Sequence, residues 1–189
     1  MRDYCDYTIL GRTTDDAAGE AFDKAARCVG LPYPGGPEID RRAKEGRAVI
    51  RFCPNLHARG DLAYSFSGLK TAVVNYVHNL TQRGEEIPVN DVCASFTAEA
   101  VGYLVDTFME CVRRRGVKSA ALAGGVAANS YLRARLGEAC AAEGVKLFVP
   151  PPVLCTDNAA MIAVAGTIAY QHGRRADLGI SADAGLPLQ

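Results

Sequence analysis

The chain has 189 residues, and its 21 basic and 21 acidic residues give a formal net charge of zero. This length allows one large domain or two small ones, and the balanced charge excludes a global field that would attract nucleic acid. The seven cysteines are odd in number and contain no C-x-x-C pair, which argues against a disulfide framework or a zinc ribbon. With no membrane-length apolar run and no apolar signal region, we expect a cytoplasmic protein that has no membrane partner.

Hydrophobic periodicity and turn residues predict alternating strands and helices along the chain. In the first half we expect, in order, a strand at 4–11, a helix at 15–29, a turn-rich loop at 31–37, a short polar helix at 38–44 and a strand at 47–52. In the second half we expect helices at 67–82 and 90–115, a strand at 117–123, a helix at 130–143, a strand at 145–149 and a helix at 158–172. Thr14 is expected to cap the first helix, and Thr156 or Asp157 the last.

The stretch Leu122-Ala-Gly-Gly-Val-Ala-Ala-Asn129 joins a predicted strand to a predicted helix within a β-α-β unit. Gly124 and Gly125 can adopt backbone angles that other residues avoid, which lets a ligand approach the main chain, and Asn129 suits a helix N-cap. Ligands of such sheets bind at the carboxyl ends of the strands. The pattern predicts a nucleotide site, although an ordinary strand-to-helix turn produces the same pattern.

Three acidic side chains share one face of the first predicted helix. Asp16, Glu20 and Asp23 are spaced four and three residues apart, so they form a stripe that can bind a ligand. The alternative is a solvated polar face on which Glu20 pairs with Lys24. The Gly35-Gly36 pair lies between two prolines, where its N–H groups can grip a hydroxyl or a carboxylate, or simply form a tight turn.

Residues that could bind a metal are few. Asp157 precedes a small, apolar helix, so it is either an N-cap or a carboxylate that holds a hard cation. His57, His78 and His172 lack H-x-x-x-H spacing, so we expect surface histidines and no autonomous catalytic metal site. The basic run 113–115 lies at the end of a predicted helix, where the helix dipole explains it better than contact with RNA does.

Five motifs follow one another along the chain: Asp15-Asp-Ala-Ala-Gly-Glu-Ala-Phe-Asp-Lys24, Tyr33-Pro-Gly-Gly-Pro37, Phe66-Ser-Gly-Leu-Lys70, Ala123-Gly-Gly-Val-Ala-Ala-Asn129 and Cys155-Thr-Asp-Asn158. Together they closely resemble the TsaD (Gcp) family, the bacterial counterpart of the archaeal KEOPS catalytic subunit. The resemblance runs almost end to end. It implies an α/β fold of the actin-like, sugar-kinase-like (ASKHA) ATPase type, with residues 1–173 as the C-terminal lobe, a helical insertion at about 31–90, and a tail at 174–189.

The resemblance also implies a reaction in the biosynthesis of threonylcarbamoyladenosine (t6A). The family transfers the threonylcarbamoyl group of threonylcarbamoyl-adenylate to N6 of the adenosine beside the anticodon of a tRNA, and AMP leaves. By resemblance, the positions that bind the substrate are Asp23, Gly36, Asp40, Gly124, Gly125 and Asn129. Asp157 would bind a divalent metal, iron or zinc in relatives, that acts as a Lewis acid on the carbamoyl carbonyl. No covalent enzyme intermediate is expected.

Part of the family pattern is absent from this sequence. The family's first lobe, its early phosphate loop and its H-x-x-x-H pair of metal ligands would all lie before Met1, so we expect a chain that is incomplete and inactive alone. We expect it to need that first lobe, TsaB-like and TsaE-like proteins, and tRNA. It should also show exposed apolar surface. The alternative is a non-catalytic nucleotide-binding or scaffold module that pairs with a TsaD-like or TsaB-like partner; a metallopeptidase is disfavoured because no zincin motif occurs.

Overall fold

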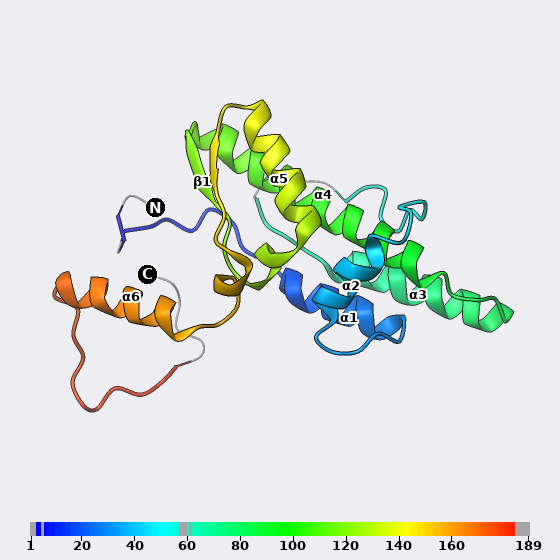
Figure 1. Ribbon diagram of the computed structural model, residues 1–189, viewed down its shortest axis with the longest axis horizontal. Helices are drawn as coiled ribbons and strands as arrows, with labels where there is room; N and C mark the ends of the chain where they lie inside the picture. The colour runs from blue at the N-terminus through cyan, green and yellow to red at the C-terminus, as the bar shows by residue number, and fades with distance from the viewer. Residues whose placement is uncertain (1–2, 5, 57–59, 61, 184–189) are drawn as a thin grey trace.

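The computed structural model describes residues 3, 4, 6–56, 60 and 62–183. Within them the elements are, in order, α1 (Ala18–Cys28), α2 (Gly35–Ala43), α3 (Ser67–Arg83), α4 (Val89–Arg115), β1 (Ser119–Ala121), the 3-10 turn η1 (Gly125–Ala128), α5 (Ser130–Ala142), β2 (Lys146–Phe148), the 3-10 turn η2 (Pro152–Leu154) and α6 (Ala159–Gln171). The protein is therefore rich in helix and carries a small parallel sheet, which confirms the α/β class in this coarse form (Figure 1).

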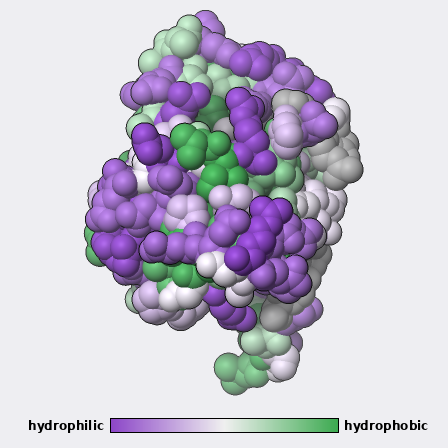
Figure 2. All heavy atoms as spheres, turned by 90° about the vertical axis from the view of Figure 1, so that its right-hand side faces the viewer, coloured by the Kyte–Doolittle hydropathy of each residue, from purple (hydrophilic) through white to green (hydrophobic). Residues whose placement is uncertain are grey.

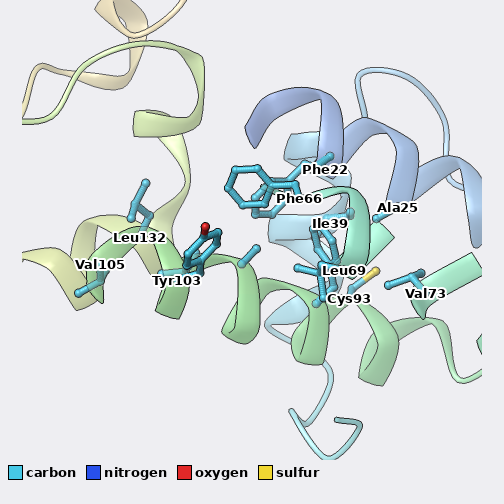
Figure 3. Close-up of a cluster of buried hydrophobic side chains, with 14 of the residues drawn as sticks. Phe22, Ala25, Ile39, Phe66, Leu69, Val73, Cys93, Tyr103, Val105 and Leu132 are labelled. Atoms are coloured by element: carbon cyan, nitrogen blue, oxygen red, sulfur yellow. The ribbon is translucent and has the colours of Figure 1, made fainter. Parts of the chain in front are cut away.

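The 27-residue helix α4 runs through the centre of the helical part, and α1, α2, α3 and α5 pack against it (Figure 1). Its apolar positions recur at helical spacing, as expected for a helix covered on several sides. The rings of Phe22 and Phe96 meet edge to face at 5.0 Å between centroids. Figure 3 shows Phe22, Phe66, Ile39 and Leu69 converging above α4 in this core. Burying each such side chain contributes about 1.5 to 3 kcal/mol.

The predicted β-α-β unit is confirmed. Strands β1 and β2 pair in parallel, with Ser119 opposite Lys146 and Ala121 opposite Phe148, and α5 connects them. Gly116 follows α4 with a φ of 60°, a left-handed angle that ends a helix readily when no Cβ is present. The turn that was singled out in the sequence therefore lies directly after the first strand of this sheet.

Two predicted strands are wrong. Within residues 6–11 no strand forms, and the N-terminal segment pairs further along, where Tyr64 donates to Arg12 at 3.0 Å and accepts from Thr14 at 2.8 Å. Residues 47–53 join no sheet, and the Val49 amide makes a local bond to the Arg47 carbonyl at 2.9 Å. Amide groups of this segment donate to side chains on one face of α4, at 2.8 to 3.0 Å: Arg47 to Asp91, Ile50 to Ser95, and Phe52 and Cys53 to Glu99. The predicted strand is therefore an irregular segment whose partner is a helix.

Helix starts also differ from the predictions. Helix α1 begins at Ala18 after an N-cap at Ala17, not at Thr14, because Asp15 and Asp16 make contacts with other elements. Helix α2 begins at Gly35, inside the predicted loop. The last helix is capped by Asn158, whose side-chain oxygen accepts from Met161 at 2.9 Å, so neither Thr156 nor Asp157 caps it.

Helix α6 lies apart from the helical core, beside the N-terminal segment (Figure 1). None of its residues is buried, and Ile162, Val164 and Tyr170 remain 65%, 58% and 60% exposed. This confirms the expectation of exposed apolar surface. The opposite end of the molecule is covered mainly by hydrophilic residues around a small hydrophobic patch (Figure 2). None of the helices in the described residues has the length and apolar content needed to cross a membrane.

Candidate functional site

The Asp23 carboxylate on α1 holds the start of α2. Its Oδ1 accepts hydrogen bonds from the amides of Gly35, at 2.7 Å, and Gly36, at 3.3 Å. A Cβ at position 35 would lie 2.5 Å from the Cβ of Ala26, so only glycine allows the two helices to approach this closely. The Gly35-Gly36 pair does grip a carboxylate, as the sequence suggested, but it is that of Asp23. Asp23 thus supplies the acceptor that an N-cap side chain would give, which Pro34 cannot provide.

Asp40 connects α2 to the start of α5. Its Oδ1 accepts from the Ser130 amide at 3.1 Å and from the Ser130 hydroxyl at 2.9 Å. Its Oδ2 lies 3.0 Å from the same hydroxyl and 3.0 Å from the Lys44 ammonium. Asp40 therefore binds Ser130, the residue that follows Asn129, although Asp40 and Ser130 are far apart in sequence. Asp40 and Asn129 were both predicted site residues.

The glycine turn has the geometry expected of a strand-to-helix junction. Gly124 has a φ of 86°, in the left-handed region that favours glycine, and Gly125 opens η1. Asn129 is the N-cap of α5, because its Oδ1 accepts from the Leu132 amide at 2.8 Å, as predicted. Gly124 and Gly125 are both exposed, so their main chain is open to a ligand.

These elements meet at one corner of the molecule. Helix α1 contacts both α2 and η1, and Gly19 of α1 faces Val126 of η1. A cavity of about 390 Å³ opens beside this corner, and Asp40, Lys44, Ser130 and Tyr131 are among the residues that line it. The structure therefore joins Asp40 of α2 to the helix that starts after the turn carrying Asn129, and Asp23 of α1 binds the start of the same α2 at Gly35 and Gly36.

Asp157 is exposed and lies one residue before the N-cap of α6. Within the described residues no group of three histidine, cysteine or acidic side chains could hold a metal ion. Of the predicted surface histidines, His78 and His172 are exposed, and His57 lies outside the described residues. Transition-metal sites normally use three or four protein ligands, so one exposed carboxylate does not by itself fit iron or zinc.

The stripe of Asp16, Glu20 and Asp23 is divided between different partners. Asp16 accepts from Lys24 and, at 3.0 Å, from Lys70 of α3, and these two hydrogen bonds lower the pKa of its carboxyl. Glu20 lies 3.5 Å from Lys24, as the solvated-face alternative expects. The stripe is thus not one ligand-binding face, because Asp16 binds α3 whereas Asp23 binds α2.

Sequence reasoning missed two side chains that organise this corner. Ser130 follows Asn129 directly, and its place beside a predicted N-cap was the one available signal. Arg133 lies one turn further along α5. It donates to the carbonyl of Ala127, which precedes α5, and to the carbonyl of Pro150, which follows β2. No sequence pattern marks it, since its partners come from separate segments. In the basic run 113–115, Arg113 pairs with Glu143 and Arg114 pairs with Glu110, which supports a structural role for these two residues.

Comparison with known proteins gives a consistent result. A family model described as TsaD, tRNA N6-adenosine threonylcarbamoyltransferase, matches residues 1–164. A protein of that name from Geobacillus kaustophilus is 51% identical over 189 residues, and one from Dictyoglomus turgidum is 50% identical over 182 residues. These alignments cover 100% and 96% of the chain, but only 55% and 54% of the two relatives. The chain, which spans about half the length of these relatives, belongs to the TsaD family.

Proposed function

We propose that this chain supplies the adenylate-binding part of a tRNA N6-adenosine threonylcarbamoyltransferase. The observation that carries the proposal is a series of contacts that ends at an exposed glycine turn: Asp23 binds the start of α2, Asp40 of α2 binds Ser130, and Asn129 caps the helix that follows the turn. The family matches support the same assignment, since relatives that are 51% and 50% identical to the chain bear that name. In this proposal the chain acts in t6A biosynthesis, as part of an acyltransferase.

The chemistry of the corner suits an adenylate. Carboxylates such as those of Asp23 and Asp40 accept hydrogen bonds from ribose hydroxyls. Asp23 already binds the first amides of α2, and Asp40 already binds Ser130 of α5. The exposed backbone of Gly124 and Gly125 allows a phosphate to lie against main-chain N–H groups near the start of α5. Asn129 keeps its side-chain amide as a further donor. These residues would hold and orient the adenylate while AMP becomes the leaving group.

The finer assignments belong to the same proposal. We place the chain in the ASKHA fold as a C-terminal lobe at 1–173, with a helical insertion at about 31–90 and a tail at 174–189. Its partners would be tRNA, TsaB-like and TsaE-like proteins, and a first lobe of the family. Asp157 stays a predicted ligand for iron or zinc, and other segments of the family would supply the remaining ligands.

Binding of a stable threonylcarbamoyl-adenylate analogue, measured by calorimetric titration, tests the proposal. Asp23→Asn keeps an acceptor for the glycine amides but removes the charge, and Asn129→Ala removes the cap. We expect saturable binding by the natural chain and at least about tenfold weaker binding by both variants, as for loss of a hydrogen bond to a charged group. Asn158→Ala, which removes the comparable cap of α6, is the matched control and should bind normally. No binding by the folded natural chain would overturn the proposal.

A scaffold function is the second candidate. It is favoured by α6, a helix with no charged residue and no buried residue, which suits a surface that pairs with a protein. The transferase and scaffold functions can be distinguished by combining the chain with a first lobe of the family and tRNA. A transferase then forms modified adenosine, whereas a scaffold binds its partner and leaves the tRNA unmodified.

A further inference from the structure

Arg133 makes three hydrogen bonds that join two separate segments of the chain. Its Nε donates to the Ala127 carbonyl at 2.5 Å, and its Nη2 donates to the Pro150 carbonyl at 2.8 Å and to the Cys155 Sγ at 3.1 Å. The first acceptor belongs to the glycine turn, and the other two lie in the segment that follows β2. One half-buried side chain on α5 therefore contacts both.

The acceptors explain why an arginine is needed. All three are uncharged, so this guanidinium is used as a fork of donors rather than as one half of an ion pair. A lysine ammonium on a flexible stem cannot reach two carbonyls and a thiol from fixed directions. The next arginine of the helix is different, since Arg135 is exposed and lies 3.8 Å from Glu138.

The segment at 150–158 has little else to hold it. Cys155 is its one buried residue, at 5% exposure, whereas Leu154, Thr156 and Asp157 are exposed. The main chain makes only short local turns there, with Leu154 donating to Pro151 at 2.9 Å. Because segments with few buried contacts open locally at low free energy, the bonds from Arg133 decide how firmly this segment is held.

We propose that Arg133 is a positioning residue that couples the Gly124–Asn129 turn to the segment carrying Asp157. A ligand that occupies the turn fixes the Ala127 carbonyl, and the guanidinium transmits that order to Pro150 and Cys155. The ligand in question is the adenylate of the proposed function, on which this inference rests. The hydrogen bonds of Arg133 are present without a ligand. Their effect on the 150–158 segment can therefore be tested separately from adenylate binding.

Hydrogen exchange of the whole chain, with and without AMP as the probe, tests this coupling. In Arg133→Gln we expect amides at 153–158 to exchange about tenfold faster without ligand, as for loss of hydrogen bonds to a charged donor. Amides in the core of α4 should exchange at the natural rate. In the natural chain AMP should slow exchange both at 124–129 and at 153–158, whereas in Arg133→Gln it should slow exchange only at 124–129.

Further variants separate positioning from general stability. Arg133→Lys should behave like Arg133→Gln, because charge without the fork does not restore the bonds, and Arg135→Gln should behave like the natural chain. Cys155→Ala, a milder change, should also speed exchange at 153–158. Equal exchange of 153–158 in the natural chain and Arg133→Gln would overturn the inference. If AMP fails to slow exchange at 124–129 in the natural chain, the proposed adenylate-binding function is wrong. The exchange rates of the natural chain and Arg133→Gln without ligand still decide the role of Arg133.

Discussion

The carboxylate of Asp40 accepts both the amide and the hydroxyl of Ser130, at 3.1 Å and 2.9 Å. This pair is the direct link between α2, which Asp23 positions, and α5, which Asn129 caps. The Lys44 ammonium lies on the other carboxylate oxygen, but its side chain is 61% exposed. The Ser130 contacts are therefore the ones that fix the position of α5 relative to α2.

Asp40→Ala is expected to weaken binding of the threonylcarbamoyl-adenylate analogue by about tenfold, because hydrogen bonds to a carboxylate contribute roughly 1.5 kcal/mol or more. Calorimetric titration measures the change. Lys44→Gln is the control: it removes an exposed ion pair, which contributes little, so affinity should stay within about twofold of the natural value. Natural affinity in folded Asp40→Ala would contradict the assignment of Asp40 to the site.

Asp15 should make the protein sensitive to acid. Desolvation alone would raise the pKa of Asp15, but hydrogen bonds from the Ser65 hydroxyl and the Phe66 amide lower it from 3.8 to about 2. A lowered pKa in the folded state means that the stabilisation is complete above the unfolded value and disappears as the pH falls toward the folded value. The loss should therefore occur between about pH 4 and pH 2.

Urea unfolding across this pH range, followed by circular dichroism, checks the effect. In Asp15→Asn the free energy of unfolding should fall less steeply with decreasing pH, although it starts from a lower value at neutral pH. Asp106→Asn, which changes an exposed carboxylate of α4, is the control and should keep the natural slope. An unchanged slope in Asp15→Asn would show that other carboxyls determine the acid response.

Glu99 anchors the segment 47–53 to α4, since its two oxygens accept from the Phe52 and Cys53 amides at 2.8 Å each. Glu99→Ala leaves both amides without this acceptor, and we expect a loss of about 2 to 3 kcal/mol in the free energy of unfolding. Glu99→Gln keeps one acceptor oxygen and should lose less. Urea unfolding of the three proteins at neutral pH gives the comparison, and equal stability of Glu99→Ala and the natural chain would disprove the anchoring role.

The same segment shows what sequence could and could not predict. Periodicity identified the long helices, the parallel β-α-β unit and the cap at Asn129, because these depend on residues that are close in the chain. It mistook 47–52 for a strand, since a short segment with apolar residues has the same sequence pattern whether its amides meet a neighbouring strand or the side chains of a helix. The partner of Glu99 depends on tertiary packing, which local patterns do not encode.

The candidate site divides in the same way. The acidic stripe marked Asp23, the glycine pair marked Gly36, and motif resemblance added Asp40. The structure joins Asp23 to Gly36, whereas Ser130, the partner of Asp40, was not predicted. Ser130 and Arg133 were missed because each acts on a segment distant in sequence. Their roles follow from the packing of α5 against the rest of the corner, and that packing appears only in the folded chain.

Helix α6 should make the isolated chain associate with itself. Ile162 and Val164 are 65% and 58% exposed on a helix without charge, and apolar surface of this kind promotes association in water. Replacing both with glutamine should reduce the concentration-dependent increase in sedimentation coefficient, while the helical content stays close to natural. Val49→Gln, at a valine that is 66% exposed but lies in the segment 47–53, is the matched control and should associate as the natural chain does. A natural chain that stays monomeric across the whole concentration series would contradict the prediction. If the α6 variant associates as strongly as the natural chain, the self-association surface lies outside Ile162 and Val164.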